Sequence, residues 1–86
     1  CQALLQLETV EECYQFFEDI CTMAEMHALS QRLQVAKMLK DKVTYQEISR
    51  LTGASTATIS RVNRCVAYGS GGYGLVLERL EAQGEQ

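Results

Sequence analysis

Residues 44–62 read TYQEISRLTGASTATISRV, and this stretch decides the fold. A helical run over 45–52 is followed by Gly53, and glycine readily takes the left-handed conformation in which many helices end. Ser55 is a favoured N-cap residue, and the run after it predicts a second helix over 56–68. The stretch therefore predicts two short helices joined by a tight turn.

The residue types in this stretch fit the geometry of a helix-turn-helix. Two helices that cross at a steep angle need a small residue where they touch, and Ser49 supplies one. The apolar residues that we expect to point inward are Ile48 and Leu51 from the first helix and Ile59 and Val62 from the second. We therefore assign a helix-turn-helix to residues 44–66.

The outward side of the motif carries short and hydrogen-bonding side chains. Short side chains let a helix enter the major groove, where hydroxyls, amides and guanidinium groups bind base edges and phosphates. The predicted DNA-binding residues are Thr44, Gln46, Arg50, Ser55, Thr56, Ala57, Thr58, Ser60, Arg61, Asn63 and Arg64. The alternative is a helical hairpin inside a bundle, with a polar outer face and no role in binding DNA.

The charge is distributed unevenly along the chain. The net charge is −3, yet residues 1–31 contain six acidic residues and no Lys or Arg. Residues 32–64 contain seven Lys or Arg and two acidic residues, and residues 65–86 contain one arginine and three acidic residues. A basic segment between acidic flanks is typical of a polyanion-binding surface, although a solvated helix surface can have the same composition. Together with the helix-turn-helix, it favours double-stranded DNA as the partner.

The segments on either side of the motif are predicted to be helical as well. Three Thr-x-x-Glu pairs, the sequence form of a capping box, precede helical runs: Thr9 with Glu12, Thr22 with Glu25, and Thr44 with Glu47. Apolar residues recur at steps of three and four over 10–24, and in a wider stripe over 26–39. So wide a stripe indicates burial on more than one side, as in an interwound dimer. The polar residues between the apolar positions are expected to face the solvent; they are Gln31, Gln34, Lys37 and Lys40.

The whole chain is predicted to form a single all-α domain. Residues 1–43 would supply dimerisation helices, residues 44–66 the helix-turn-helix, and residues 67–86 a glycine-rich loop followed by a C-terminal helix. The run over 69–74 matches Gly-x-Gly-x-x-Gly, but no strand precedes it, so we interpret it as an interhelix loop and not as a dinucleotide site.

Several other classes of protein are disfavoured by the composition. The four cysteines lie at positions 1, 13, 21 and 65 without a Cys-x-x-Cys pair, and His27 is the single histidine, so we expect no metal site. Cys13 and Cys21 lie in an apolar helical stripe, where a free thiol acts as a small hydrophobe. No signal peptide and no long apolar run is present, which favours a cytoplasmic location without a membrane anchor. His27 has no Cys or Asp partner for nucleophilic catalysis, so we do not expect the chain to be an enzyme.

Three further motifs carry a resemblance to a known family. Residues 9–14 read TVEECY, residues 53–61 read GASTATISR, and residues 68–77 fit Tyr-Gly-x-x-Gly-Tyr-x-Leu-Val-Leu. With these motifs the chain resembles the Trp repressor superfamily, in its TrpR-related YerC/YecD family, over nearly its whole length. The resemblance implies a six-helix subunit, an intertwined homodimer and a transcriptional repressor, with the recognition helix starting at Thr56.

The resemblance also raises the question of a small-molecule effector. Members of the Trp repressor family clamp an indole between two arginines, and Arg32 and Arg61 fall at those positions. The residue after the second arginine is a glycine in the Trp repressor and is Val62 here, and a ligand-contacting serine is replaced by Cys65. We therefore disfavour tryptophan as the corepressor and expect no cofactor. We favour an interpretation in which Arg32 pairs with an acidic residue and Arg61 faces phosphate, and the alternative is another small aromatic effector of unknown identity. The other alternative is a helical adaptor that binds proteins through the same motif.

Overall fold

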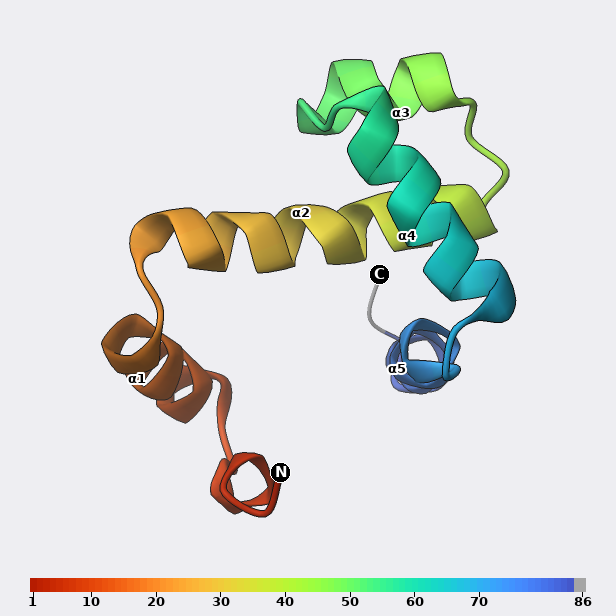
Figure 1. The fold of residues 1–86 in the computed structure, drawn as a ribbon. Helices are drawn as coiled ribbons and strands as arrows, with labels where there is room; N and C mark the ends of the chain where they lie inside the picture. The colour runs from red at the N-terminus through yellow and green to blue at the C-terminus, as the bar shows by residue number, and fades with distance from the viewer. Residues whose placement is uncertain (85–86) are drawn as a thin grey trace.

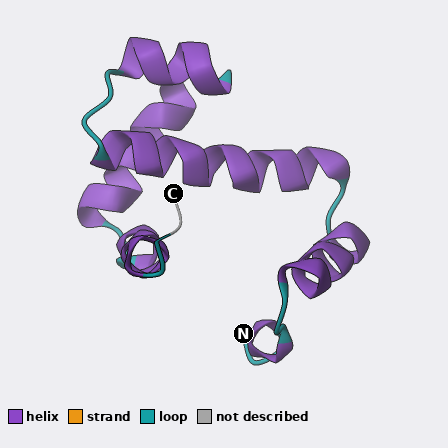
Figure 2. Cartoon of the chain, turned by 180° about the vertical axis from the view of Figure 1, so that it is seen from behind, coloured by secondary structure: helices purple, strands orange, loops and turns teal. Residues whose placement is uncertain are grey.

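The computed structural model describes residues 1–84, and all regular structure in that range is helical (Figure 2). A 3-10 helix, η1, is followed by five α-helices (Figure 1). Their bounds are η1 Leu4–Gln6, α1 Val10–Ile20, α2 Met23–Lys40, α3 Tyr45–Thr52, α4 Thr56–Tyr68 and α5 Gly72–Ala82. The all-α class is confirmed. Of the six helices expected, the first is a single 3-10 turn. The predicted C-terminal segment ends at residue 86, and its residues 85 and 86 lie outside the described residues.

Four helices begin at the N-cap residues that the sequence predicts. Thr9, Thr22, Thr44 and Ser55 each accept a hydrogen bond from the backbone N–H three residues later. These bonds satisfy amide groups that have no partner inside the helix, which is why the boundaries can be predicted from local sequence. A full reciprocal capping box forms only at Thr22, where the Glu25 carboxylate also accepts from the Thr22 N–H.

The predicted glycine-rich loop over 69–74 is too long. The turn ends at Gly71, which has a φ of 91°, and α5 already begins at Gly72. Tyr73, which was expected in the loop, is half-buried and packs against the core. The apolar contact of Tyr73 therefore outweighs the low helix propensity of the glycines beside it.

The core of the subunit lies where α3, α4 and α5 pack against the C-terminal half of α2 (Figure 1). The buried side chains are Val35, Ala36, Ile48, Ala54, Ile59, Val62 and Leu77. Three of the four predicted anchors of the helix-turn-helix are among them. The fourth prediction is wrong, because Leu51 is 53% exposed and Ala54, in the turn, is buried in its place.

The N-terminal part of the chain lies at the opposite end of α2 and has no buried residue (Figures 1 and 2). Between α1 and α2 runs an open apolar groove of about 360 Å³. It is lined by Val10, Cys13, Tyr14, Phe17, Met26, Leu29, Ser30 and Leu33. Cys13 and Cys21 are half-buried free thiols, and Cys1 and Cys65 are exposed free thiols. Much of the apolar stripe predicted for these helices is thus exposed.

Candidate nucleic-acid interface

The turn between α3 and α4 is fixed by side chains as well as by glycine. Gly53 has a φ of 77°, in the left-handed region. The Ser49 hydroxyl donates to the Ala54 carbonyl at 2.8 Å. Thr52 Oγ1 donates to the Ile48 carbonyl at 2.7 Å and accepts from the Ala54 N–H at 3.1 Å. These bonds give the part-buried polar groups of the turn hydrogen-bond partners, and they thereby stabilise the arrangement of the two helices.

A contact from α2 also holds this turn, and the sequence did not reveal it. Gln31 Nε2 donates to the Thr52 carbonyl at 3.1 Å, and the Gln31 side chain is half-buried. Gln31 was expected to face the solvent, because it lies on the polar side of the α2 sequence pattern. The tertiary packing of α3 over α2 is what gives this amide a carbonyl to bind.

The outward surface of α4 is open to solvent. Ser55, Thr56 and Ala57 are exposed at its first turn, and Thr58 and Ser60 are half-buried. Farther along the helix, the exposed side chains are Arg61, Asn63 and Arg64. The Ser55 hydroxyl donates to Thr58 Oγ1 at 3.1 Å and accepts from the Thr58 N–H at 3.1 Å. Thus Ser55 and Thr58 cap the helix, whereas Thr56 and Ala57 present their side chains freely.

The basic residues differ in whether their charge is balanced. Lys37 pairs with Asp41 at 3.1 Å, and Lys40 pairs with Glu81 of α5 at 3.0 Å. Arg50 pairs with Glu47. Within residues 1–84, no ion pair is recorded for Arg32, Lys42, Arg61 or Arg64. Of the seven Lys and Arg residues in 32–64, four therefore carry no recorded ion pair within the described part of the chain.

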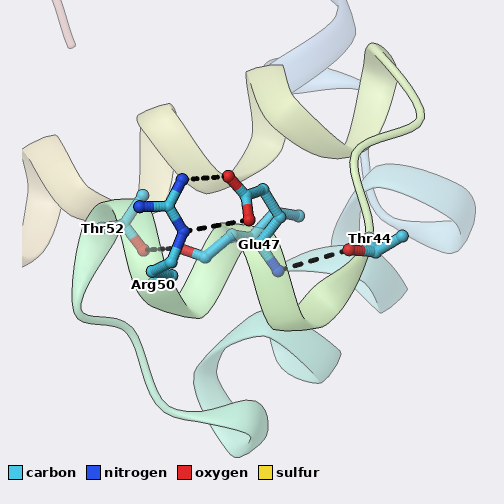
Figure 3. Close-up of polar contacts among 5 residues, drawn as sticks. Thr44, Glu47, Arg50 and Thr52 are labelled. Carbon is cyan, nitrogen blue, oxygen red and sulfur yellow. Dashed lines mark hydrogen bonds and ion pairs between the residues drawn. The ribbon is translucent and has the colours of Figure 1, made fainter.

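On α3, the ion pair between Arg50 and Glu47 takes the place of a capping interaction (Figure 3). The Glu47 N–H donates to Thr44 Oγ1 at 3.3 Å, but both carboxylate oxygens of Glu47 accept from the Arg50 guanidinium. This hydrogen bonding, with the charge of Arg50, holds the pKa of the Glu47 carboxyl below its ordinary value and raises the pKa of Arg50. Of the predicted contact residues on α3, Gln46 and Thr44 are exposed and Arg50 is exposed but neutralised.

A small cavity lies between α2 and α4. It has a volume of about 180 Å³, and both Arg32 and Arg61 line it. The remaining lining residues are Thr58, Val62, Cys65 and Tyr73. The structure thus brings together the two arginines that stand far apart in the sequence. It also places the buried Val62 in the wall of the same cavity.

Within residues 1–84, no three His, Cys, Asp or Glu side chains form a group that could hold a metal ion. None of the helices described is both long enough and apolar enough to cross a bilayer.

Comparison with known proteins agrees with this geometry. Residues 1–81 match the family of the Trp repressor protein. The uncharacterized protein YerC of Bacillus subtilis (strain 168) is 52% identical over 79 residues, which cover 92% of this chain and 76% of YerC.

Two solved structures share the fold. A candidate Trp repressor from Staphylococcus aureus superposes with a TM-score of 0.90 at 55% identity, covering 93% of this chain and 80% of that one. A TrpR-like protein from Eubacterium eligens ATCC 27750 gives a TM-score of 0.90 at 57% identity, covering 93% and 82%. The chain, with its helix-turn-helix set on a helical scaffold, belongs to the Trp repressor family, and YerC is among its relatives.

Proposed function

We propose that this protein is a sequence-specific DNA-binding transcriptional regulator that acts as a repressor in the cytoplasm. The observation that carries the proposal is the exposed, hydroxyl-lined first turn of α4, a helix that Ile59 and Val62 anchor in the buried core. In this proposal Thr56 and Ala57 contact base edges, and Arg61, Asn63 and Arg64 contact bases or phosphates. The free amides at the N-termini of α3 and α4 add favourable sites for phosphate.

The experiment that tests this function is DNA binding across a salt series. The protein is mixed with labelled genomic fragments, and the association constant is measured at several salt concentrations. A DNA-binding protein should lose affinity along a straight line on a log–log plot, with a slope of about −0.9 for each phosphate neutralised. If no fragment binds even at low salt, the proposal is wrong. A pull-down that captures a protein partner after nuclease treatment would then favour the adaptor function.

We further propose that the functional unit is a homodimer. The apolar groove between α1 and α2 and the exposed side chains around it, such as Tyr14 at 61% and Ile20 at 62% exposure, are covered by a second copy in this proposal. A small domain that leaves this much apolar surface open gains stability by association. A two-fold dimer with two recognition helices would bind half-sites about 34 Å apart, so a pseudo-palindromic operator is expected.

The dimer can be tested with a charge placed in the groove. In Leu29→Glu, a carboxylate enters the apolar lining, and we expect the light-scattering mass to fall from twice the 9.6 kDa of the chain to a single copy. The reason is that burying an unpaired charge costs several kcal/mol, roughly the size of a modest association energy. Gln15→Glu on the exposed side of α1 is the matched control and should remain dimeric. A monomeric parent protein would refute the dimer directly.

The Arg50–Glu47 pair predicts a variant that binds DNA more tightly. Glu47→Gln removes a negative charge from the interface and frees the Arg50 guanidinium, so we expect affinity to rise several-fold and the salt slope to steepen by up to about 0.9 per subunit. The measurement is the same salt series.

Glu12→Gln is the matched control for this variant. Glu12 holds the equivalent capping position on α1, which does not contact α3, and it loses the same charge. If both variants gained the same DNA affinity, the gain would follow net charge alone. The ion pair with Glu47 would then not restrict the binding of Arg50 to DNA.

A second candidate function is regulation by a small flat effector. The cavity between Arg32 and Arg61 supports it, because planar guanidinium groups stack well on aromatic rings. The side chain of Val62 in the cavity wall favours a ligand other than tryptophan. Calorimetric titration with aromatic amino acids and other flat aromatic acids tests this. Absence of heat across the panel would leave Arg32 with a structural role.

A further inference from the structure

The last carbonyl of α3 belongs to Thr52, and it accepts a hydrogen bond from outside its own helix. Carbonyls in the last turn of an α-helix have no N–H partner within the helix. Gln31 Nε2 of α2 donates to the Thr52 carbonyl at 3.1 Å, in a part-buried setting. A part-buried carbonyl without a donor is costly, because it has lost water without gaining a partner. The amide of Gln31 therefore completes the C-terminal end of α3.

This bond differs from the others in the turn because it comes from a distant part of the chain. The Ser49 and Thr52 hydroxyls bind backbone groups no more than five residues away. Gln31 lies 21 residues before Thr52, and among residues 1–84 no other side-chain hydrogen bond is recorded between α2 and the helix-turn-helix. Because a hydrogen bond depends on direction and apolar packing does not, the Gln31 bond fixes the orientation of the turn on α2.

The placement of Thr52 also affects the start of α4. Thr52 Oγ1 accepts from the Ala54 N–H at 3.1 Å, and Ala54 is buried in the core. The next residue, Ser55, is the N-cap of α4, and Thr56 and Ala57 follow it in the exposed first turn. A rotation of the turn on α2 would therefore shift the side chains that the proposed function assigns to base edges.

Base recognition and phosphate attraction respond differently to such a shift. Hydrogen bonds to base edges require a side chain to be placed within about 0.5 Å of its productive position. The attraction between basic residues and phosphates arises from counterion release, supplies non-specific binding and tolerates small displacements. Loss of the Gln31 bond should therefore weaken binding to the operator more than binding to unrelated DNA.

We propose that Gln31 is a positioning residue for operator recognition, and that its bond to the Thr52 carbonyl sets the orientation of the first turn of α4. Gln31 contacts no DNA in this role. The proposal rests on the proposed DNA-binding function, and it assigns part of the sequence discrimination to a residue of α2, outside the helix-turn-helix.

Two substitutions at Gln31 separate the hydrogen bond from the packing of the side chain. Gln31→Met keeps an unbranched side chain of similar length and has no donor. Gln31→Lys keeps an N–H donor on a side chain one bond longer, so it should restore the bond. Gln34→Met is the matched control, because Gln34 is exposed on the same helix and no hydrogen bond of its side chain is recorded within residues 1–84.

The binding measurement compares two DNA duplexes. The parent protein first selects an operator from random DNA, and each variant is then titrated with that operator and with an unrelated duplex at the same salt concentration. In Gln31→Met, the affinity for the operator should fall roughly three- to ten-fold, which corresponds to the net loss of one hydrogen bond. The affinity for the unrelated duplex should change by less than about two-fold, and the salt slope should stay that of the parent, because no charge is lost.

The other two variants should keep the discrimination of the parent protein. Gln31→Lys adds a charge that strengthens binding to both duplexes alike, so the ratio of the two affinities should be retained. Gln34→Met should match the parent in both affinities. Thermal unfolding checks that every variant is folded at the temperature of the titrations. If Gln31 contributed only to stability, the melting temperature would fall and the ratio of affinities would not change.

Nuclear magnetic resonance detects the bond in the absence of DNA. In the parent protein, one Nε2 hydrogen of Gln31 should exchange slowly with the solvent. The backbone amide resonances of Gly53 and Ala54 should shift in Gln31→Met and not in Gln34→Met. A rapidly exchanging Gln31 amide, with unchanged Gly53 and Ala54 resonances in Gln31→Met, would contradict the bond itself.

The outcomes distinguish the role of Gln31 from the proposed function. If the parent discriminates between the two duplexes and Gln31→Met keeps the same ratio, Gln31 has no positioning role, while the DNA-binding function stands. The role is equally refuted if both affinities of Gln31→Met fall together, if Gln34→Met loses as much discrimination, or if Gln31→Lys does not retain it. If the parent protein binds no DNA, the proposed function fails and the role of Gln31 fails with it.

Discussion

In Arg64→Ala, the DNA affinity at 0.1 M salt should fall by about an order of magnitude for each subunit, and the salt slope should become shallower by about 0.9 per subunit. Arg64 is exposed on α4, and no ion pair is recorded for it within residues 1–84. Its full charge is therefore available to replace counterions on the phosphate backbone. Isothermal titration or fluorescence anisotropy across the salt series measures both quantities.

The control for Arg64→Ala is a base outside the interface. Arg79 is exposed on α5, and Arg79→Ala removes the same formal charge. We expect its slope to match that of the parent, because a charge beyond about one Debye length from the phosphates is screened. If both variants lost the same DNA affinity, the loss would be due to net charge, and a phosphate contact at Arg64 would be contradicted.

The second large effect is expected in Ile59→Ala, in the core beneath the recognition helix. Ile59 is fully buried and is among the largest of the fully buried side chains, and it anchors α4 in the core. Truncation of a buried isoleucine costs about 2 to 5 kcal/mol, because apolar contacts are lost and a cavity remains. For a small domain, this corresponds to a drop in melting temperature of at least about 10 °C.

The measurement for Ile59→Ala is urea and thermal unfolding followed by circular dichroism. Thr56→Ala on the exposed first turn of the same helix is the control, and it should change the free energy of unfolding by about 0.5 kcal/mol or less. If Ile59→Ala and Thr56→Ala are equally stable, the core described here does not support the motif. Specific DNA binding should also weaken in Ile59→Ala, since α4 loses its anchor.

Much of the helix-turn-helix could be predicted because its signals are local. Thr44, Gly53 and Ser55 act on groups within a few residues of themselves, as N-cap, left-handed end and N-cap. Both ends of α3 and the start of α4 follow from these three residues. Periodicity likewise found the inward positions of Ile48 and Ile59, because each lies on the one apolar side of its helix.

The errors arose where a residue's environment is set by a distant segment. Leu51 was expected in the core and is 53% exposed, whereas Ala54 in the turn is buried. Gln31, which was expected to face the solvent, hydrogen-bonds the Thr52 carbonyl because α3 lies over α2. The seven bases counted in residues 32–64 include Lys40, whose charge is balanced in the structure by an ion pair with Glu81, 41 residues away.

By itself, the sequence determined that the chain is helical, where most helices begin, and which short side chains α4 presents to its surroundings. Capping, glycine conformation and helical periodicity are interactions between near neighbours, so a linear pattern records them. Only the tertiary packing shows which bases carry no ion pair within residues 1–84, and that Arg32 and Arg61 line one cavity. Both properties depend on distances between segments that are far apart in the sequence, and no local pattern of residues encodes such distances.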